Sequence, residues 1–434
     1  MSWKKVKLCD VCTIEKGAIG IQKATPGEFP LVVTGEERKS HNEYQFDCEA
    51  VIIPLVSGTG HGHASIKRLH FQTGKFALGS ILCAVIPRDP KQLSAEYLFR
   101  FLELNKENEL VARMKGMANV TLPIKEIAQI EIPLPTINDQ SDFVDMFKAL
   151  ENQSNFISTE LIHQRTLVKK LRQQLLQDAV QGKLVEQNPK DETASELLKK
   201  IKAEKEKLIA EKKLKKEKEL PPIKPEEIPF EIPENWVWCR GEIVATYIDP
   251  QPSHRTPPES TDGVPYIAMS DIRKDGTLDF NSARKVSRTV LEEHQNRYKL
   301  QDGDFIFGKI GTIGKPVKLP YPFNYTLSAN VILIQPERNL VNRDYLFYFL
   351  SSPAAEKNLI ENKSTMSYPV FGMGKARNMP IPLPPLAEQN RIVRKLNELM
   401  QYCNELEASI KQSELQNEKL LQQVLREALR KEPV

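Results

Sequence analysis

The sequence predicts an α/β (α+β) protein of two similar globular domains, joined by two long helices that form an antiparallel coiled coil with pseudo-twofold symmetry. Three observations carry this prediction: an internal repeat, strand-like runs before each copy of a proline-rich motif, and a heptad pattern after it. The motif reads IPLPTINDQ at 132–140 and IPLPPLAEQ at 381–389. At an offset of 249 without gaps, about fourteen of the forty-nine positions from Ile132 to Val180 are identical.

The repeat also extends towards the N-terminus of each copy. SAEYLFRFL at 94–102 matches NRDYLFYFL at 342–350, and VKLCDVCTI at 6–14 resembles WCRGEIVATYI at 238–248. Two copies of a long unit argue against a solenoid, whose repeats are short and stack at least three deep. A duplicated chain is the covalent equivalent of a homodimer, which suits a twofold target or a pair of partners.

Length and composition fit a protein of two domains with connecting helices. The 434 residues exceed one ordinary core, and a net charge of +4 means that any anion-binding surface is local. The longest apolar runs, VIIPLV at 51–56 and ILCAVI at 81–86, are far shorter than the roughly 20 residues of a membrane span, and we interpret them as buried strands. Six scattered cysteines and an N-terminus without an apolar segment predict a cytoplasmic protein that does not contact a membrane.

Each half shows the same order of elements. Short Val-, Ile- and Phe-rich runs separated by Gly, Pro and Asn predict strands, and the YLFxFL segment predicts a helix. The prolines of IPLP predict an extended segment, and a long helix follows. We expect a first domain over 1–135, a central long helix over 136–182, a charged helix and proline-rich linker over 183–235, a second domain over 236–384 and a distal long helix over 385–431.

Local signals set the expected ends of the helices in the middle of the chain. Gly182 is expected to end the central helix, because glycine adopts the left-handed conformation of a helix C-terminus. Thr193 and Glu196 have the spacing of a capping box and predict a charged helix that runs to about Leu220. Glutamates between the lysines at 199–218 favour a solvated helix face over a DNA-binding one.

The two long helices carry apolar residues at alternating spacings of four and three, which predicts a coiled-coil seam. Polar residues interrupt the pattern at Gln164 and Ser413, with Asn417 one step further on, and such positions fix the register of a coiled coil. The alternative is two independent amphipathic helices, each packed on its own domain. The predicted seam residues are Phe143, Phe147, Leu150, Ile157, Leu161, Val168, Leu171 and Leu175, with Ile392, Leu396, Leu399, Cys403, Leu406, Ile410, Leu420 and Val424 in the copy.

The length of these helices suggests a use for an antiparallel pair. A helix of about 45 residues spans roughly 68 Å at 1.5 Å per residue. One turn of B-DNA is about 34 Å. A pair with a domain near each end would therefore set two reading domains at least one DNA turn apart.

The sequence contains no recognisable catalytic or metal site. GKIGTIGK at 308–315 lacks the first glycine of a phosphate-binding loop, where Lys309 stands, and proline follows Lys315 in place of Ser or Thr. Cys9 and Cys12 have zinc-knuckle spacing but no second CxxC pair. Motifs of an amino-methyltransferase or a nuclease are absent from the sequence. A binding protein is the remaining interpretation.

Basic and polar residues on turn-rich segments are the candidate DNA contacts. Basic side chains contact phosphates, and Arg, Asn, His and Ser read base edges in the major groove. The two sets differ although the scaffold repeats, as expected for a reader of two different half-sites; each residue taken alone is also compatible with an ordinary surface position. The candidates are Arg38, Lys39, Thr59, His61, Lys67 and Arg68 in the first half, and His254, Arg255, Arg273, Lys274, Arg284, Lys285, Lys309 and Lys315 in the second.

Together, these motifs resemble the DNA specificity subunit of type I restriction-modification systems. The resemblance covers essentially the whole chain and depends on the two IPLPxxxxQ motifs, QQLLQDAVQGKL at 173–184, ASELLKKI at 194–201 and FEIPENWVW at 230–238. Thr136, Ile137 and Asp139 depart from the IPLPPLxE form of the second copy. The first copy's long helix is therefore expected to begin slightly differently.

The resemblance implies two target recognition domains, each reading one part of a split, asymmetric sequence in double-stranded DNA. It implies that the paired helices, through the predicted seam residues and the faces beside them, dock two modification subunits and, through these, restriction and translocase subunits. The chain itself would be non-catalytic and hold no cofactor, with S-adenosylmethionine, ATP and Mg²⁺ on the partner subunits. Two alternatives are a coiled-coil adaptor without a DNA role and a stand-alone DNA methyltransferase or nuclease.

Overall fold

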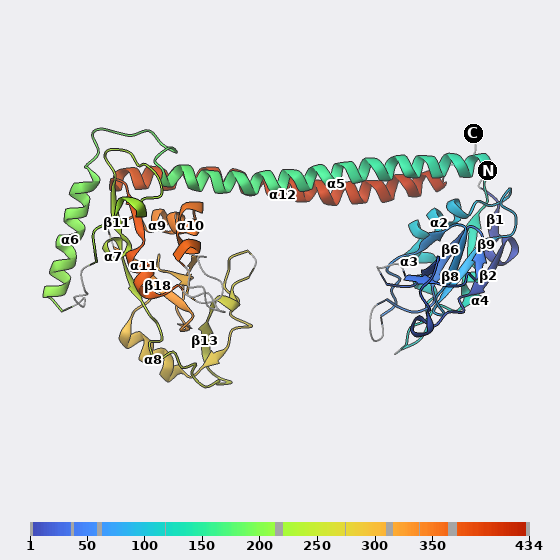
Figure 1. Ribbon diagram of the computed structural model, residues 1–434, viewed down its shortest axis with the longest axis horizontal. Helices are drawn as coiled ribbons and strands as arrows, with labels where there is room; N and C mark the ends of the chain where they lie inside the picture. Colours follow the sequence, from blue (N-terminus) through green and yellow to red (C-terminus); the bar gives the residue numbers. More distant parts are fainter. Residues whose placement is uncertain are drawn as a thin grey trace. The chain divides into compact units, whose positions relative to one another are not determined.

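The computed structural model of the protein describes residues 3–35, 39–58, 63–117, 119–212, 220–273, 275–309, 316–337, 339–362 and 371–430. The chain divides into two compact units (Figure 1). Unit 1 comprises 1–164 and 410–434, and unit 2 comprises 165–409. The long helix α5 (Ile137–Val180) begins in unit 1 and ends in unit 2, and α12 (Leu386–Arg430) begins in unit 2 and ends in unit 1.

Unit 1 contains a four-stranded antiparallel sheet in the order β2-β9-β6-β7 and a second sheet in the order β4-β3-β8-β5. In the second sheet β3 and β8 are parallel, and β1 pairs separately with β10. The elements are β1 (Lys5–Lys7), α1 (Leu8–Val11), β2 (Cys12–Lys16), η1 (Ile21–Lys23), β3 (Phe29–Val32), β4 (Lys39–His41), β5 (Phe46–Asp47), β6 (Ala50–Pro54), β7 (His70–Gln72), β8 (Lys75–Leu78), β9 (Leu82–Pro87), α2 (Ala95–Leu104), α3 (Lys106–Glu109), η2 (Val111–Arg113), α4 (Ile124–Ala128) and β10 (Glu131–Pro133).

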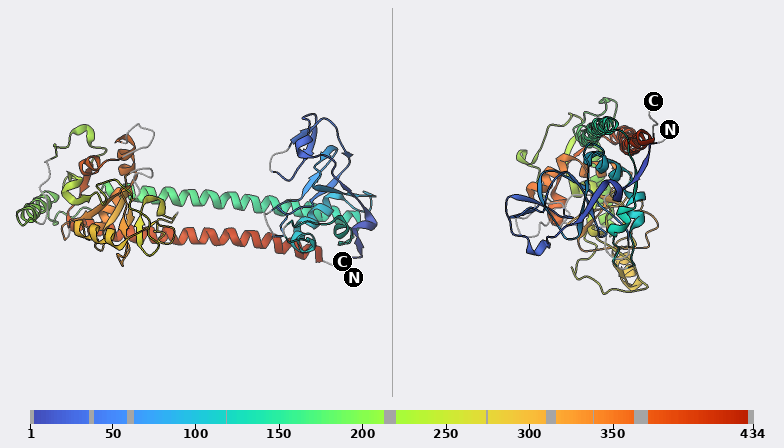
Figure 2. Two further views of the ribbon diagram at one scale, coloured as in Figure 1. Left: turned by 90° about the horizontal axis from the view of Figure 1, so that it is seen from below. Right: turned by 90° about the vertical axis from the view of Figure 1, so that its right-hand side faces the viewer.

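Unit 2 repeats this topology with sheets in the orders β12-β18-β15-β16 and β14-β13-β17 and the separate pair β11-β19. It adds α8, which lies at the end of the unit away from the long helices (Figures 1 and 2). The elements are α6 (Ala194–Ala210), η3 (Pro225–Glu227), β11 (Val237–Arg240), α7 (Gly241–Val244), β12 (Ala245–Ile248), β13 (Val264–Ile267), η4 (Met269–Asp271), β14 (Lys285–Val286), α8 (Arg288–Arg297), β15 (Phe305–Gly308), β16 (Val317–Lys318), β17 (Thr326–Leu327), β18 (Val331–Pro336), α9 (Arg343–Leu350), α10 (Pro353–Asn362), α11 (Met373–Asn378) and β19 (Pro380–Leu383).

The central sheet of each unit is buried on both faces, which explains its uninterrupted apolar runs. Alternate residues of a strand point to opposite faces. In β6, Val51 and Ile53 pack in the core that includes α2 and the start of α5, whereas Ala50 and Ile52 pack with the second sheet. The strands of unit 2 divide in the same way between two cores. The buried strands predicted at 51–56 and 81–86 are therefore confirmed as β6 and β9.

The repeated IPLPxxxxQ motif forms the joint between each domain and its long helix. In unit 1 the fully buried Gln140 accepts a hydrogen bond from Ser94 N (2.8 Å) and donates to the carbonyl oxygens of Gln92 (2.9 Å) and Pro135 (3.0 Å). The hydroxyl of Tyr97 donates to the carbonyl oxygen of Pro133 (3.1 Å). One buried side chain thus satisfies three backbone groups on the two segments that meet at this joint.

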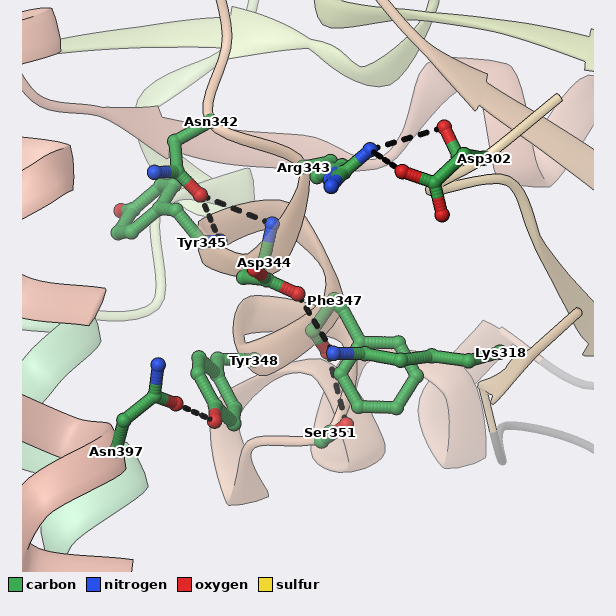
Figure 3. Close-up of polar contacts among 10 residues, drawn as sticks. All are labelled: Asp302, Lys318, Asn342, Arg343, Asp344, Tyr345, Phe347, Tyr348, Ser351 and Asn397. Carbon is green, nitrogen blue, oxygen red and sulfur yellow. Dashed lines mark hydrogen bonds and ion pairs between the residues drawn. The ribbon is translucent and has the colours of Figure 1, made fainter. Parts of the chain in front are cut away.

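The joint recurs in unit 2 with the equivalent residues. Gln389, also fully buried, accepts from Asn342 N (2.8 Å) and donates to the carbonyl oxygen of Pro384 (2.9 Å). Tyr345 donates to the carbonyl oxygen of Pro382 (2.7 Å). Figure 3 shows the residues around α9, where the Asn342 side chain caps the helix by accepting from the backbone N–H groups of Asp344 and Tyr345. The motif is therefore a structural device in both copies.

Around this joint, α9 is held by polar contacts on several sides (Figure 3). Arg343 pairs with Asp302 (2.6 Å), and Lys318 pairs with Asp344 (2.6 Å). The hydroxyl of Tyr348 donates to the side chain of Asn397 in α12. These contacts tie the loop before β15, the strand β16 and the long helix to one short helix.

In each unit the two long helices pair in antiparallel orientation. In unit 1, Asn417 contacts Ser154 and Ser158, while Leu425 shares a core with Phe143. In unit 2, Arg172 binds Asn404 (2.7 Å) and Glu407 (2.9 Å), while Ala179, later in α5, packs with Ile392, earlier in α12. The predicted fold class is confirmed, and the alternative of two independent helices is wrong.

Four predicted seam residues are wrong. Ile157, Leu171, Leu406 and Leu420 are between 43% and 61% exposed. The next residue in each case contacts the partner helix or its core: Ser158, Arg172, Glu407 and Leu421. At three of these layers the residue in the seam is polar, so the heptad count chose an apolar neighbour; at the fourth, two adjacent leucines match the pattern and Leu421 is the one that packs in the core. The other predicted seam residues are buried or half-buried.

Of the predicted polar interruptions, Asn417 lies in the seam of unit 1, where its amide donates to the hydroxyl oxygens of Ser154 and Ser158, both at 3.1 Å. Gln164 is exposed and bonds to Glu160 on its own helix, so its predicted place in the seam is wrong.

The segment after α5 follows its local signals. Gly182 has φ of +72°, and Lys183 N bonds to the carbonyl oxygen of Asp178 (2.9 Å), as at a glycine-terminated helix. Thr193 and Glu196 form the predicted capping box of α6. The helix ends at Ala210, about ten residues before the predicted end at Leu220; residues 213–219 lie outside the described residues.

Replacing Gln140 by Leu should lower the free energy of unfolding by about 1–3 kcal/mol, because three buried or half-buried hydrogen bonds to the backbone would be lost. Urea unfolding followed by circular dichroism measures this change. Gln164→Leu, on the exposed face of the same helix, is the matched control and should change the free energy of unfolding little. Equal effects of the two substitutions would contradict the structural role of the joint.

Candidate nucleic-acid interface

In unit 1 the predicted basic residues lie on the second sheet and on the segment before β7. Lys39 is exposed on β4, Lys67 is exposed, and Arg68 is half-buried. Arg38, Thr59 and His61 lie outside the described residues. Among the described residues, the candidate anion contacts of unit 1 therefore lie at two places, on β4 and on the segment before β7.

An aromatic and basic pair that the sequence analysis missed lies on the same sheet. The ammonium group of Lys75, on β8, lies 4.8 Å from the ring centroid of Tyr44, which is 46% exposed and packs edge-on against Phe29. An exposed ring next to a cation can stack on a base and contact its phosphate. These residues are 31 positions apart in sequence, so only the pairing of β5 with β8 brings them together.

In unit 2 the predicted basic residues gather on two neighbouring segments. His254 and Arg255 are exposed on the loop after β12, and Arg284 and Lys285 are exposed at β14. Backbone hydrogen bonds from Ser260 N to the Lys285 carbonyl oxygen (3.1 Å) and from Tyr266 N to that of Arg284 (2.7 Å) join β14 to the segment that follows this loop. Arg273 is exposed and pairs with Asp279 (3.0 Å). Lys274 and Lys315 lie outside the described residues.

Lys309 is not on the surface, which corrects the prediction that it is an exposed basic residue. It is 7% exposed, and its ammonium group binds Asp249 Oδ2 (2.8 Å). Burial of a charge requires a partner of opposite sign, and Asp249 supplies it at the start of the loop that carries His254. Lys309 therefore anchors this loop.

The loop Asp249–Arg255 has a defined conformation built from its own side chains. Asp249 Oδ1 accepts from Gln251 N (3.1 Å), and the Gln251 amide donates to Ser253 Oγ (2.9 Å) and to the carbonyl oxygen of Arg255 (3.0 Å). His254 closes a turn on the carbonyl oxygen of Gln251 (3.0 Å) with φ of +53°, a conformation that L-residues rarely adopt. Its imidazole lies 3.9 Å from Asp249 Oδ2.

A buried polar network beneath this loop centres on His294 of α8. Its Nε2 lies 2.6 Å from Gln251 Oε1, and its Nδ1 contacts the hydroxyl groups of Thr326 and Tyr298. Because the Gln251 amide nitrogen already donates to a carbonyl, Oε1 is an acceptor and the histidine proton resides on Nε2. Burial, with a smaller contribution from Arg297, lowers the pKa of His294 to about 4. The imidazole is therefore neutral near pH 7.

A cavity of about 330 Å³ adjoins this network. Its walls include the rings of Tyr298, Phe323 and Tyr325 beside His294. Each polar atom of His294 is satisfied by the network, so the cavity presents mainly apolar surface. Nothing in its lining has the donor set of a catalytic or cofactor site.

The cysteines are free thiols. Cys9 lies in α1 and Cys12 is buried at the start of β2, where burial raises the pKa of its thiol to about 12. Within the described part of the chain, His, Cys, Asp and Glu side chains nowhere gather in a group of three or more that could hold a metal ion. The helices described here include none with the length and apolar character needed to cross a membrane.

Comparison with known protein families identifies two matching segments. The model for the type I restriction modification DNA specificity domain matches residues 1–164 and 252–416. The specificity subunit of the type I restriction enzyme EcoAI from Escherichia coli is 29% identical over 335 residues, which cover 75% of this chain and 55% of that subunit. The EcoDI specificity subunit from Escherichia coli is 23% identical over 100% of this chain and 89% of its own length. For EcoAI and EcoEI, the matches span about half the length of these curated relatives.

Two solved structures have the same fold. The HsdS subunit from Thermoanaerobacter tengcongensis superposes with a TM-score of 0.53 at 17% identity, covering 99% of this chain and 97% of that one. A chain from work on complex assembly and conformational transition of the type I R-M system gives a TM-score of 0.58 at 18% identity, covering 99% and 98%.

The buried His294 predicts a specific pH dependence of stability. Its pKa is lowered from 6.5 to about 4 in the folded protein, so between these values the unfolded chain binds a proton that the folded chain does not. The contribution of this site to stability is therefore full above about pH 6.5 and falls as the pH decreases towards 4. The unfolding midpoint of the wild type should fall more steeply from pH 7 to 5 than that of His294→Gln, which cannot titrate. Parallel pH profiles would contradict this assignment.

Proposed function

Because the chain belongs to the family of type I restriction modification DNA specificity domains, we propose that it recognises a bipartite, asymmetric sequence in double-stranded DNA and scaffolds the enzymes that act on it. Each unit reads one part of the sequence. The chain is non-catalytic; S-adenosylmethionine, ATP and Mg²⁺ belong to partner subunits. We expect the assembled complex in the cytoplasm.

The observation that carries this proposal is the contrast between repeated and non-repeated residues. The joint residues Gln140 and Gln389 and the tyrosines that accompany them recur at equivalent positions. The exposed basic residues recur only in part: Lys39 of β4 and Arg284 beside β14 hold corresponding positions on the second sheets, whereas His254 and Arg255 lie after β12 and the residues after β2 in unit 1 read GAIGIQ. A duplicated scaffold with two different basic surfaces is suited to two different half-sites.

Exposed apolar residues on the long helices support docking of two modification subunits. Ile157 in α5 and Leu406 in α12 are equivalent by the repeat, as are Leu171 and Leu420, and all four are exposed. Packing within the units leaves 43–61% of these apolar residues uncovered. They are suited to contact with two copies of the same partner, one for each helix. Restriction and translocase subunits would join through these partners.

Selection from a pool of duplexes with a randomised centre tests DNA recognition. The full chain should enrich two short defined tracts separated by an undefined spacer, and footprinting should protect both tracts. Affinity should fall steeply as the salt concentration rises, because phosphate contacts release counterions. Methyl transfer should require added modification subunit. Absence of sequence preference at every salt concentration would favour the adaptor alternative, and methyl transfer by the chain alone would favour a stand-alone methyltransferase.

Charge substitutions on the helices test the docking surfaces. Ile157→Glu and Leu406→Glu should each remove one of two bound modification subunits, and the double variant should remove both, because a buried carboxylate disfavours an apolar interface. Native mass spectrometry of the reconstituted complex measures the stoichiometry. Ile162→Glu, five residues and about 140° further round α5, is the control. Unchanged stoichiometry in the double variant would contradict this docking model.

A further inference from the structure

The loop Asp249–Arg255 is anchored at three successive residues to two other elements of unit 2, the end of β15 and the helix α8. Asp249 binds Lys309 at the end of β15 (2.8 Å), the carbonyl oxygen of Pro250 accepts from Arg297 of α8 (3.1 Å), and Gln251 Oε1 lies 2.6 Å from His294 Nε2. Gln251, His294 and Lys309 are each less than a tenth exposed. Each of three consecutive loop residues thus makes a polar contact that is buried or half-buried.

The anchored residues 249–251 hold the exposed residues 252–255 of the loop in place. Gln251 spans the turn by donating to Ser253 Oγ and to the carbonyl oxygen of Arg255, and His254 between them is fixed at a positive φ. Backbone conformations of this kind persist only where surrounding contacts impose them, and they cluster at binding sites. The side chains that emerge from the constrained turn are His254 and Arg255, both exposed.

Both ring nitrogens of His294 form hydrogen bonds that fix the loop to the domain. One ring nitrogen donates to Gln251 and the other accepts from Thr326 or Tyr298, whose hydroxyl oxygens lie 3.2 Å apart. Thr326 lies in β17 of the second sheet, so the imidazole connects the loop to the rigid part of the domain. A loop held in its bound conformation loses less conformational freedom on binding.

We propose that His294 is a positioning residue for DNA recognition by unit 2: through Gln251 it holds the loop Asp249–Arg255 in one conformation, so that His254 and Arg255 meet the DNA already ordered. The inference rests on the proposed function and deepens it, since it names the segment of unit 2 that reads one half-site. His294 itself does not contact DNA. Its effect passes through the Gln251 amide.

The test uses the full chain and a pool of duplexes with a randomised centre, with enriched sequences determined for each variant. Arg255→Ala first identifies the tract that the loop reads. His294→Phe should then reduce base preference at that same tract by about tenfold, the size of one lost base contact, and leave the other tract unchanged. His294→Gln, whose amide retains one donor and one acceptor, should restore much of the preference. Hydrogen exchange at the amides of 251–256 should quicken in His294→Phe and less in His294→Gln.

Tyr345→Phe is the matched control, because it removes another buried hydrogen bond of unit 2 (2.7 Å to the Pro382 carbonyl oxygen) at the joint with α12. It should lower thermal stability without changing base preference. If His294→Phe does not fold, Gln251→Leu replaces it, because it removes the same hydrogen bond from the side of the loop. Its base preference is then compared with that of His294→Gln. The proposal is overturned if the folded variants keep the wild-type preference, or if the tract that weakens differs from the tract identified by Arg255→Ala. Absence of preference in the wild type would overturn the proposed function instead.

Discussion

The buried glutamine of each IPLPxxxxQ motif is the interaction on which the architecture depends. The strands β10 and β19 end within the motif, and the carbonyl oxygens of Pro135 and Pro384 beyond them need hydrogen-bond donors from elsewhere. Gln140 and Gln389 resolve this by binding the backbone of the preceding extended segment and of the loop that leads into the short aromatic helix. The direction in which each long helix leaves its own domain is thereby fixed.

A second constraint acts along the long helices. Their seam contains polar contacts, such as Asn417 with Ser154 and Ser158 and Arg172 with Glu407, among apolar layers. Polar groups in a seam are satisfied in one register only, so they lower stability but specify the pairing. At these polar layers the adjacent apolar residues, including Ile157 and Leu406, lie on the outer surface. The polar layers therefore fix the register, and the exposed apolar residues beside them form the proposed docking surface.

The proposed recognition surfaces are built differently from the scaffold. Unit 2 uses ion pairing and hydrogen bonding beneath a loop, with Lys309 and His294 both buried. Unit 1 instead offers an exposed tyrosine ring with a lysine above it. Because the central sheets are buried on both faces by apolar residues, they tolerate little change. The loops beyond them can vary without disturbing the core, which is how one fold can serve two half-sites.

The sequence alone determined the repeat, the strand and helix classes, the two long helices and the capping box at Thr193, because these depend on local pattern and short-range hydrogen bonding. Tertiary structure alone decided which residue of each adjacent pair enters the seam, as with Leu171 and Arg172. The heptad pattern marks apolar residues only, so it does not predict a polar residue whose partner lies on the other helix. It also decided that Lys309 is buried and that Gln251 meets His294, 43 residues away. Contacts between distant segments arise from strand order and packing, and single-sequence spacing does not encode them.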